Sequence, residues 1–190
     1  MVQDGSAQPV DLAVERRRIR IRGALALALC VLLLGFGVHW LPRWLSFPVD
    51  LADRLAFAFR ANLFVLTWLF VAVGIVSTIR RYSAEDNAGS AFSLPSSRLA
   101  IPAAFLQNTL EQVVITMSAF LALATVEGEA ALAYIVASLP LFALGRIAFL
   151  RGYPGGAGAR AFGMVTTALP SLGAFAWAAY DIVGQLLAST

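Results

Sequence analysis

A polar string, LQNTLEQ at 106–112, interrupts an otherwise apolar stretch of the chain. Gln107 and Asn108 precede Glu111 by four and three residues, so all three project from one face if the segment is helical. An ionisable side chain at membrane depth costs about 2.5–3.5 kcal/mol on insertion scales, so Glu111 needs a proton or a cation. We therefore expect this stripe to turn away from lipid.

Arg146 is the cation that we expect to pair with Glu111, because antiparallel packing of their two segments would place both side chains at a similar depth. Arg80 and Arg81 close an earlier apolar run, and Arg160 opens the last one, at the same level. Two interpretations stay open. The cluster is either a buried structural pair with helix-end anchors, or a pocket whose guanidinium groups bind a small anionic ligand.

The composition indicates a membrane protein. Of 190 residues, 59% are hydrophobic and only 13% are charged, with a net charge of +3 and a mean hydropathy of +0.78. A soluble domain carries about a quarter charged residues. The basic residues, all arginine, sit at the ends of apolar runs rather than along one soluble face, so no nucleic-acid partner is predicted. The single cysteine, Cys30, excludes a disulfide framework, and no metal site is predicted.

Five apolar runs are each about as long as the ~20 residues that cross a bilayer core. They lie at 23–41, 61–79, about 102–126, 130–149 and 161 to about 187. A polar linker at 82–98 separates the second run from the third, and a short Gly-rich loop at 153–160 separates the fourth from the fifth. Only EGE at 127–129 joins the third run to the fourth, so those two must be antiparallel neighbours. The predicted fold is an all-α polytopic membrane helix bundle with one domain.

The arginines predict the orientation of the chain. With the amino terminus in the cytoplasm, most of them lie inside, including the basic run of the amino-terminal segment 1–22, and only Arg43, Arg54 and Arg60 lie outside. The positive-inside rule favours this arrangement, which places the carboxyl terminus outside. We expect an integral protein of a bacterial inner membrane. A cleavable signal peptide is the alternative for the first run, but no clear small-residue cleavage site follows it.

With these motifs, the sequence resembles the family of membrane-associated proteins in eicosanoid and glutathione metabolism. The resemblance rests on Asn108 and Glu111 in NTLE, on Gly145 and Arg146 in LFALGRIAFLRGY, on Tyr153 and Arg160, and on TTALP at 166–170, with Arg80 and Arg81 upstream. It covers residues from about 60 to 187, which contain four runs, the usual helix count of the family. The run at 23–41 would then be an additional transmembrane helix.

The resemblance implies a homotrimer that holds glutathione near the cytoplasmic side and directs its thiolate at a lipophilic electrophile or peroxide within the bilayer. Arg160 would be the catalytic residue, because a nearby cation favours the ionised sulfur. Asn108, Glu111 and Tyr153 would hold the tripeptide. Arg146 would orient Glu111, and Arg80 or Arg81 would meet a carboxylate.

The chain departs from the family pattern at several positions. Better-known members carry arginine at the positions of Gln107 and Ala104, and Ile115 and Ala161 also depart from the pattern. We still include Gln107 among the residues predicted to bind glutathione. The alternative is a noncatalytic member of the fold that binds a lipid or a partner helix. A proton or ion path through Glu111 is a third hypothesis, ranked last because the third run offers few polar residues beyond it.

Overall fold

The structure is a computed structural model that describes residues 11–189, and within them the chain forms five α-helices, one short 3-10 turn and no strand. The helices are α1 (Leu12–Trp44), α2 (Leu51–Arg81), α3 (Ser97–Ala124), α4 (Glu129–Gly152) and α5 (Gly156–Ala188), and the 3-10 turn η1 (Tyr153–Gly155) joins the last two. The prediction of an all-helical chain is confirmed. Each predicted run falls largely within one helix, whereas residues 1–10 of the predicted segment 1–22 lie outside the described residues.

Capping side chains set the helix starts, which precede the apolar runs. The Asp11 carboxylate accepts hydrogen bonds from the Ala13 and Val14 amides at 2.9 and 3.2 Å, and Asp50 accepts one from the Ala52 amide at 2.9 Å. Such caps satisfy amides that have no partner within the helix. The basic run of the amino-terminal segment therefore belongs to α1 and continues into the apolar run without a break.

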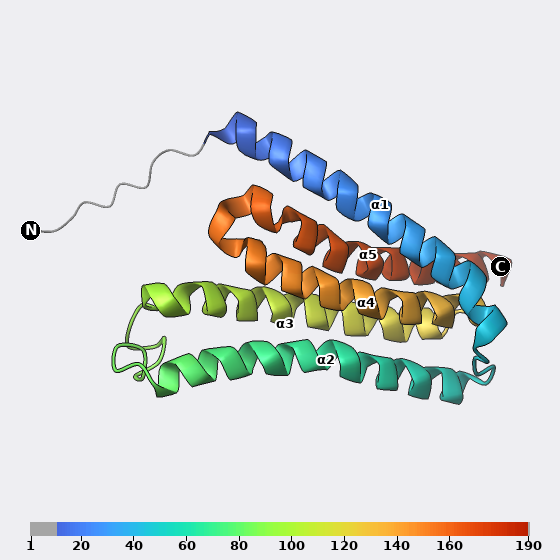
Figure 1. The fold of residues 1–190 in the computed structure, drawn as a ribbon. Helices are drawn as coiled ribbons and strands as arrows, with labels where there is room; N and C mark the ends of the chain where they lie inside the picture. Colours follow the sequence, from blue (N-terminus) through green and yellow to red (C-terminus); the bar gives the residue numbers. More distant parts are fainter. Residues whose placement is uncertain (1–10, 190) are drawn as a thin grey trace, which may run out of the picture.

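The five helices lie side by side, and α1 and α2 form the outer edges of the arrangement (Figure 1). α4 packs against α5, α2 packs against α3, and α1 lies across both α4 and α5. α3 and α4 are in contact and are joined only through residues 125–128, so the predicted antiparallel pair is confirmed. The main core lies between the helices and includes the fully buried Phe120, Leu123, Leu132 and Ile135.

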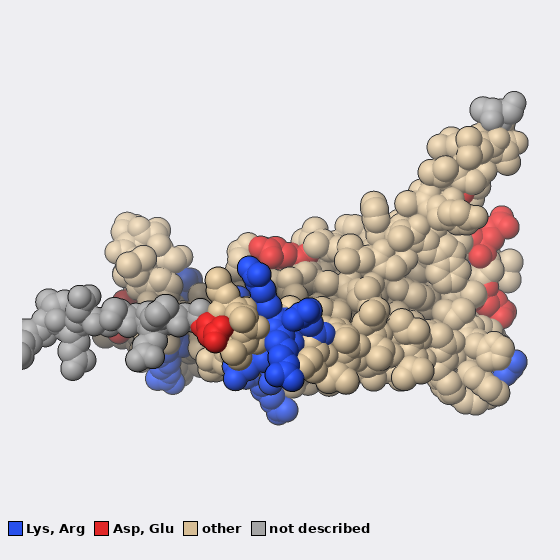
Figure 2. Space-filling model, turned by 90° about the horizontal axis from the view of Figure 1, so that it is seen from above, with Lys and Arg blue, Asp and Glu red and all other residues tan. Residues whose placement is uncertain are grey.

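The two ends of the molecule differ in the charged side chains that they carry. We call the end where α1 begins and α4 turns into α5 the basic end; it carries Arg16, Arg17, Arg18, Arg20, Arg22, Arg80, Arg81, Arg98 and Arg151. The opposite end, which we call the acidic end, carries Asp50, Asp53, Glu127 and Glu129. Figure 2 shows arginines gathered near the start of α1 and acidic side chains at the far end.

Three helical stretches within residues 11–189 are long and apolar enough to cross a membrane: Leu12–Trp44, Leu51–Arg81 and Glu129–Ala188, the last of which contains α4, η1 and α5. Together with the composition, they indicate an integral membrane protein. α3 is not among them, and its polar string at 106–112 lowers its hydropathy. A crossing by α3 stays a prediction.

Two buried side chains, Cys30 and Arg54, donate to backbone carbonyls that have no partner within their helix. Pro170 has no amide to donate to the Thr166 carbonyl one turn earlier, and the thiol of Cys30 on α1 donates to that carbonyl at 3.9 Å. At the acidic end, the buried Arg54 guanidinium donates to the carbonyls of Ala124, Val126 and Gly128, where α3 ends. These contacts fix α1 to α5 and α2 to α3.

The loop between α2 and α3 is tied by Asp86. Its carboxylate accepts hydrogen bonds from the Ser96 amide at 2.8 Å, the Ser96 hydroxyl at 2.7 Å and the Ser83 hydroxyl at 2.8 Å. These bonds, led by those from Ser96, hold the pKa of Asp86 below its usual value. Since Ser96 caps α3 through the Leu99 amide, the loop and the start of α3 form one hydrogen-bonded unit.

Candidate functional site

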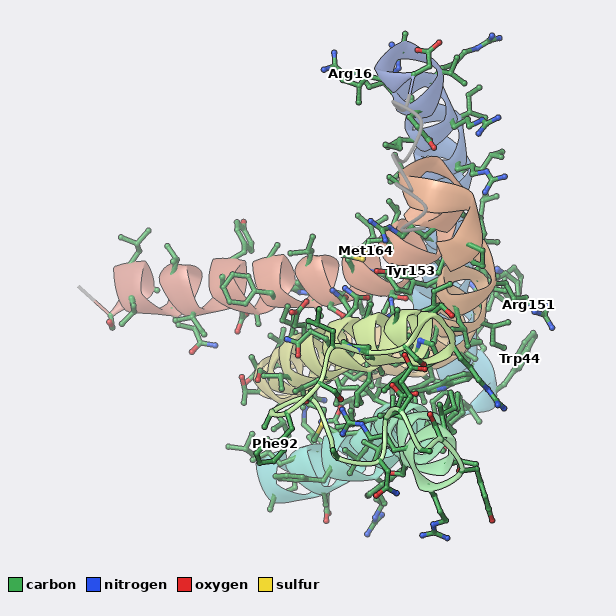
Figure 3. All side chains as sticks on the ribbon, turned by 90° about the vertical axis from the view of Figure 1, so that its left-hand side faces the viewer. Arg16, Trp44, Phe92, Arg151, Tyr153 and Met164 are labelled. Carbon is green, nitrogen blue, oxygen red and sulfur yellow. The ribbon has the colours of Figure 1, made fainter. Side chains whose placement is uncertain are left out.

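A cavity of about 320 Å³ opens at the basic end between α3, α4 and α5. Its lining includes three of the predicted site residues, Asn108, Tyr153 and Arg160. Figure 3 shows Tyr153 beside Met164 of α5, which also lines the cavity. The other lining residues are apolar: Ile19, Ala104, Phe149, Ala157 and Ala161. α3, η1 and α5 thus bring the amide of Asn108, the phenol of Tyr153 and the guanidinium of Arg160 to one hollow.

Arg160 is half-buried, and its guanidinium carbon lies 4.7 Å from the centre of the Tyr153 ring. A cation over an aromatic face is attracted by the ring. Arg160 makes no hydrogen bond or ion pair with any described residue, so its N–H donors remain free for an anion. The Tyr153 ring in turn meets the edge of Phe149, at 5.6 Å between ring centres.

A sharp reversal places Arg160 beside Tyr153. The predicted loop at 153–160 is wrong, because only η1 separates the two helices, and Arg160 lies in the second turn of α5. Gly156 has a φ of 81°, a left-handed conformation that favours glycine, and it starts the new helix directly after the turn. Gly152 allows the close approach, since a Cβ there would overlap the backbone of Ala159.

Arg146 is fully buried and bonds to neutral partners. Its Nη1 donates to Asn108 Oδ1 at 2.8 Å, while its Nε and Nη2 donate to Thr167 Oγ1 at 3.2 and 2.9 Å. The guanidinium also lies 5.0 Å from the centre of the Phe149 ring. The Asn108 oxygen is thereby occupied, and the amide nitrogen faces Met164 Sδ at 3.8 Å. Arg146 therefore positions Asn108 at the cavity.

The predicted ion pair between Glu111 and Arg146 is wrong. Glu111 is exposed on α3 and accepts a hydrogen bond from Gln107 Nε2 at 3.0 Å. Three residues fall about 60° short of a full helical turn, so Asn108 faces α4 and α5 while Glu111 points outward. The expected orientation of Glu111 by Arg146 is therefore not found, and neither Gln107 nor Glu111 lines the cavity.

The remaining predicted site residues, Arg80 and Arg81, close α2, and neither lines the cavity. Arg81 is exposed. Arg80 is half-buried, and its Nε has no hydrogen-bond partner among the described residues. We predicted that arginines from several helices would gather around one cavity. Within residues 11–189, Arg160 is the one cation that lines the cavity, so the prediction is only partly confirmed.

The sequence reasoning missed residues that complete the site. Thr167 lies three residues after Met164 and seven after Arg160, so the three side chains share one face of α5. This spacing could have been recognised from the sequence. The wall formed by Ile19 had no local signal, because it depends on how α1 docks.

α1 is tied to the site by two polar contacts with the start of α5. Glu15 Oε2 accepts a hydrogen bond from the Gly158 amide at 3.0 Å, and Arg22 Nη1 donates to the Ala159 carbonyl at 2.7 Å. A Cβ at Gly158 would overlap the Glu15 carboxylate. A carboxylate at a helix amino terminus accepts a hydrogen bond from an amide that has no partner within the helix, and its negative charge interacts favourably with the helix dipole. The helix outside the predicted four-helix core therefore closes one side of the cavity.

Within residues 11–189, no group of three or more His, Cys, Asp and Glu side chains could hold a metal ion. The fold and the site define an all-helical integral membrane protein with a small, mainly apolar cavity that presents one guanidinium, one amide and one phenol. No protein-family model, curated protein or solved structure matches the chain.

Proposed function

We propose that the protein is a membrane-embedded, glutathione-dependent transferase or peroxidase that acts on a lipophilic electrophile or lipid peroxide. The resemblance in residues 60–187 suggests this class, with α2 to α5 as the family-like core and α1 as an addition. The observation that carries the proposal is Arg160, which lies at the cavity without a hydrogen-bond or ion-pair partner among the described residues, beside Tyr153 and Asn108.

The chemistry asks little of the protein beyond a stabilised anion and a dry acceptor site. Bound glutathione would supply the sulfur nucleophile. The Arg160 guanidinium favours the thiolate over the thiol, because a nearby cation lowers a thiol pKa. The Asn108 amide, oriented by Arg146, and the Tyr153 hydroxyl supply donors for the polar groups of the tripeptide. The apolar side chains of Ile19, Phe149 and Met164 provide the surface on which a lipophilic acceptor would lie.

The cavity of one chain fits the thiol end of the tripeptide better than its two carboxylates. Arg160 is its only cationic lining residue within the described chain, and Arg80 and Arg81 lie at the end of α2. A homotrimer, which the resemblance implies, would let Arg80 or Arg81 of a neighbouring copy supply the missing charge. The positive-inside rule supports a basic end that faces the cytoplasm, where glutathione would enter.

The test measures thiol consumption by the purified protein in detergent. Glutathione is offered with several aryl halides and one lipid hydroperoxide, and the wild type is compared with Arg160→Ala. The matched control is Arg98→Ala, which removes an exposed arginine of the basic end outside the cavity. We expect Arg160→Ala to lose about 100-fold in rate, the usual effect of removing one charge-stabilising donor, and Arg98→Ala to retain it. Equal rates for Arg160→Ala and the wild type with every acceptor would reject the proposal.

A second candidate is a noncatalytic protein that binds a lipid or a partner helix in this cavity. Its largely apolar lining and single cation favour it. Thermal unfolding separates the candidates, because a ligand that binds the folded state raises the unfolding temperature. Stabilisation by lipids with none by millimolar glutathione would support binding without thiol chemistry.

A further inference from the structure

A second hollow of about 440 Å³ lies at the basic end, between α1, α4 and α5. We call it the α1 groove; it is lined by Arg22, Leu25, Ala148, Arg151, Gly152, Ala159 and Phe162. It shares no lining residue with the cavity of Arg160. Figure 3 places Arg151 and Tyr153 on different sides of the turn between α4 and α5. The α1 groove is therefore a separate site.

Two guanidinium groups form the polar part of the α1 groove. Arg22 is held in place, because its Nη1 donates to the Ala159 carbonyl at 2.7 Å. Arg151, in the last turn of α4, is exposed and makes no hydrogen bond or ion pair with any described residue. Among residues 11–189, no acidic residue lines the groove. Two arginines with free donors and no internal counter-charge are suited to a phosphate group.

The rest of the α1 groove is apolar and lies where lipid tails begin. Arg22 directly precedes the apolar run of α1, so its charge falls at headgroup level, and Leu25 and Phe162 follow below it. Farther along the contact between α1 and α4, a second apolar hollow of about 200 Å³ includes Leu33 and Pro140 in its lining. The hollows thus follow one seam between the two helices.

The spacing of these hollows matches one leaflet of a bilayer. Leu25 and Leu33 are eight residues apart, about 12 Å along the helix axis. One leaflet contributes about 15 Å to a hydrocarbon core of ~30 Å. A chain that starts at Arg22 and runs along the seam therefore reaches the second hollow within one leaflet.

We propose that the α1 groove binds an anionic glycerophospholipid. The phosphodiester lies between Arg22 and Arg151, and one acyl chain follows the seam between α1 and α4 toward Leu33. Basic pockets between transmembrane helices recognise anionic headgroups in this way. Figure 2 shows the arginines of α1 gathered on this face. The site gives the additional helix a role, because α1 supplies Arg22, Leu25 and Leu33, and it is independent of the proposed thiol chemistry.

The test compares lipid retention by the full chain in nanodiscs. The protein is reconstituted in equal amounts of phosphatidylglycerol and phosphatidylcholine, extracted into detergent, and analysed by native mass spectrometry. We expect phosphatidylglycerol to be retained in preference, and Arg151→Gln to reduce that preference by about fivefold, the effect of one arginine near anionic lipid. Arg98→Gln, which removes an exposed charge from the same end but outside the groove, should keep the wild-type preference.

Thermal unfolding in detergent adds an arm that separates the lipid from a free anion. Phosphatidylglycerol should raise the unfolding temperature of the wild type and of Arg98→Gln more than that of Arg151→Gln, whereas inorganic phosphate should not. Equal lipid retention by Arg151→Gln and Arg98→Gln would overturn the proposal. So would an equal rise in unfolding temperature with inorganic phosphate, since the site would then recognise a free anion.

Discussion

At the scale of single residues, Arg146 determines how the candidate site is arranged. It is a fully buried cation that has no carboxylate partner among the described residues and is compensated by Asn108, Thr167 and the ring of Phe149. Burying a guanidinium away from water costs free energy, so the N–H donors of Arg146 need hydrogen-bond acceptors within the protein. The planar fork reaches α3 and α5 at once, which a lysine ammonium cannot reproduce with the same geometry.

We expect Arg146→Ala to lower the free energy of unfolding by about 2–4 kcal/mol, because it opens a void and leaves buried polar groups unpaired. Arg146→Lys should be milder in stability but should still reduce thiol consumption, since Asn108 loses its orienting donor. Denaturant unfolding in detergent, followed by the assay described above, measures both effects. Thr167→Val on α5 is the comparison variant: it removes the hydroxyl that accepts from Arg146 and donates to the Gly163 carbonyl, so it should cost about 1–2 kcal/mol. Full activity in Arg146→Lys would contradict the positioning role.

At the scale of elements, the first turns of α1 depend on their contact with the start of α5. Arg16, Arg17, Arg18 and Arg20 are exposed, so these turns are held by the bonds of Glu15 and Arg22 rather than by burial. A segment with few buried contacts opens locally more readily than the core. We therefore expect the Glu15 carboxylate to help hold this part of α1, and with it Ile19, at the cavity.

We expect Glu15→Ala to accelerate tryptic cleavage after these arginines by about two- to fivefold, because a charge at a helix terminus contributes about 0.3–1 kcal/mol. Limited proteolysis under native conditions, with the fragments identified by mass, measures the rate. Glu85→Ala is the control, since Glu85 is exposed in the loop between α2 and α3 and makes no hydrogen bond with α1 or α5 among the described residues. Equal cleavage of the two variants would show that Glu15 does not hold the segment.

The sequence predicted the helices well because a run of apolar residues near 20 long has few alternatives in a membrane protein. It missed the start of α1 because Asp11 caps the helix well before the apolar run begins. Asn108, Tyr153 and Arg160 meet at the cavity, whereas Glu111 points elsewhere. Helical spacing fixes the angle between Asn108 and Glu111, but only packing decides which of them faces the neighbouring helices.

At the scale of the whole molecule, the predicted crossing by α3 would bring polar side chains on one of its faces against lipid. Gln107, Glu111 and Ser118 are exposed on it, beside the apolar Val114 and Ile115. α5 also projects from the body toward its carboxyl end (Figure 3). An ionised carboxylate against lipid costs about 2.5–3.5 kcal/mol, and the hydrogen bond from Gln107 offsets only part of this cost. A neighbouring copy packed on this face would remove Glu111 from lipid.

We therefore expect Glu111→Trp to weaken self-association, because a large ring would block close packing of a second copy against α3. Light scattering combined with size-exclusion chromatography in detergent measures the protein mass directly, and the mutant should shift toward the monomer. Leu32→Trp is the matched control, since Leu32 is 70% exposed on α1 and lies outside that face. An unchanged mass for Glu111→Trp, or a monomeric wild type, would place Glu111 against lipid or detergent instead. In that case Glu111→Leu should raise the free energy of unfolding, because it removes the cost of the exposed charge.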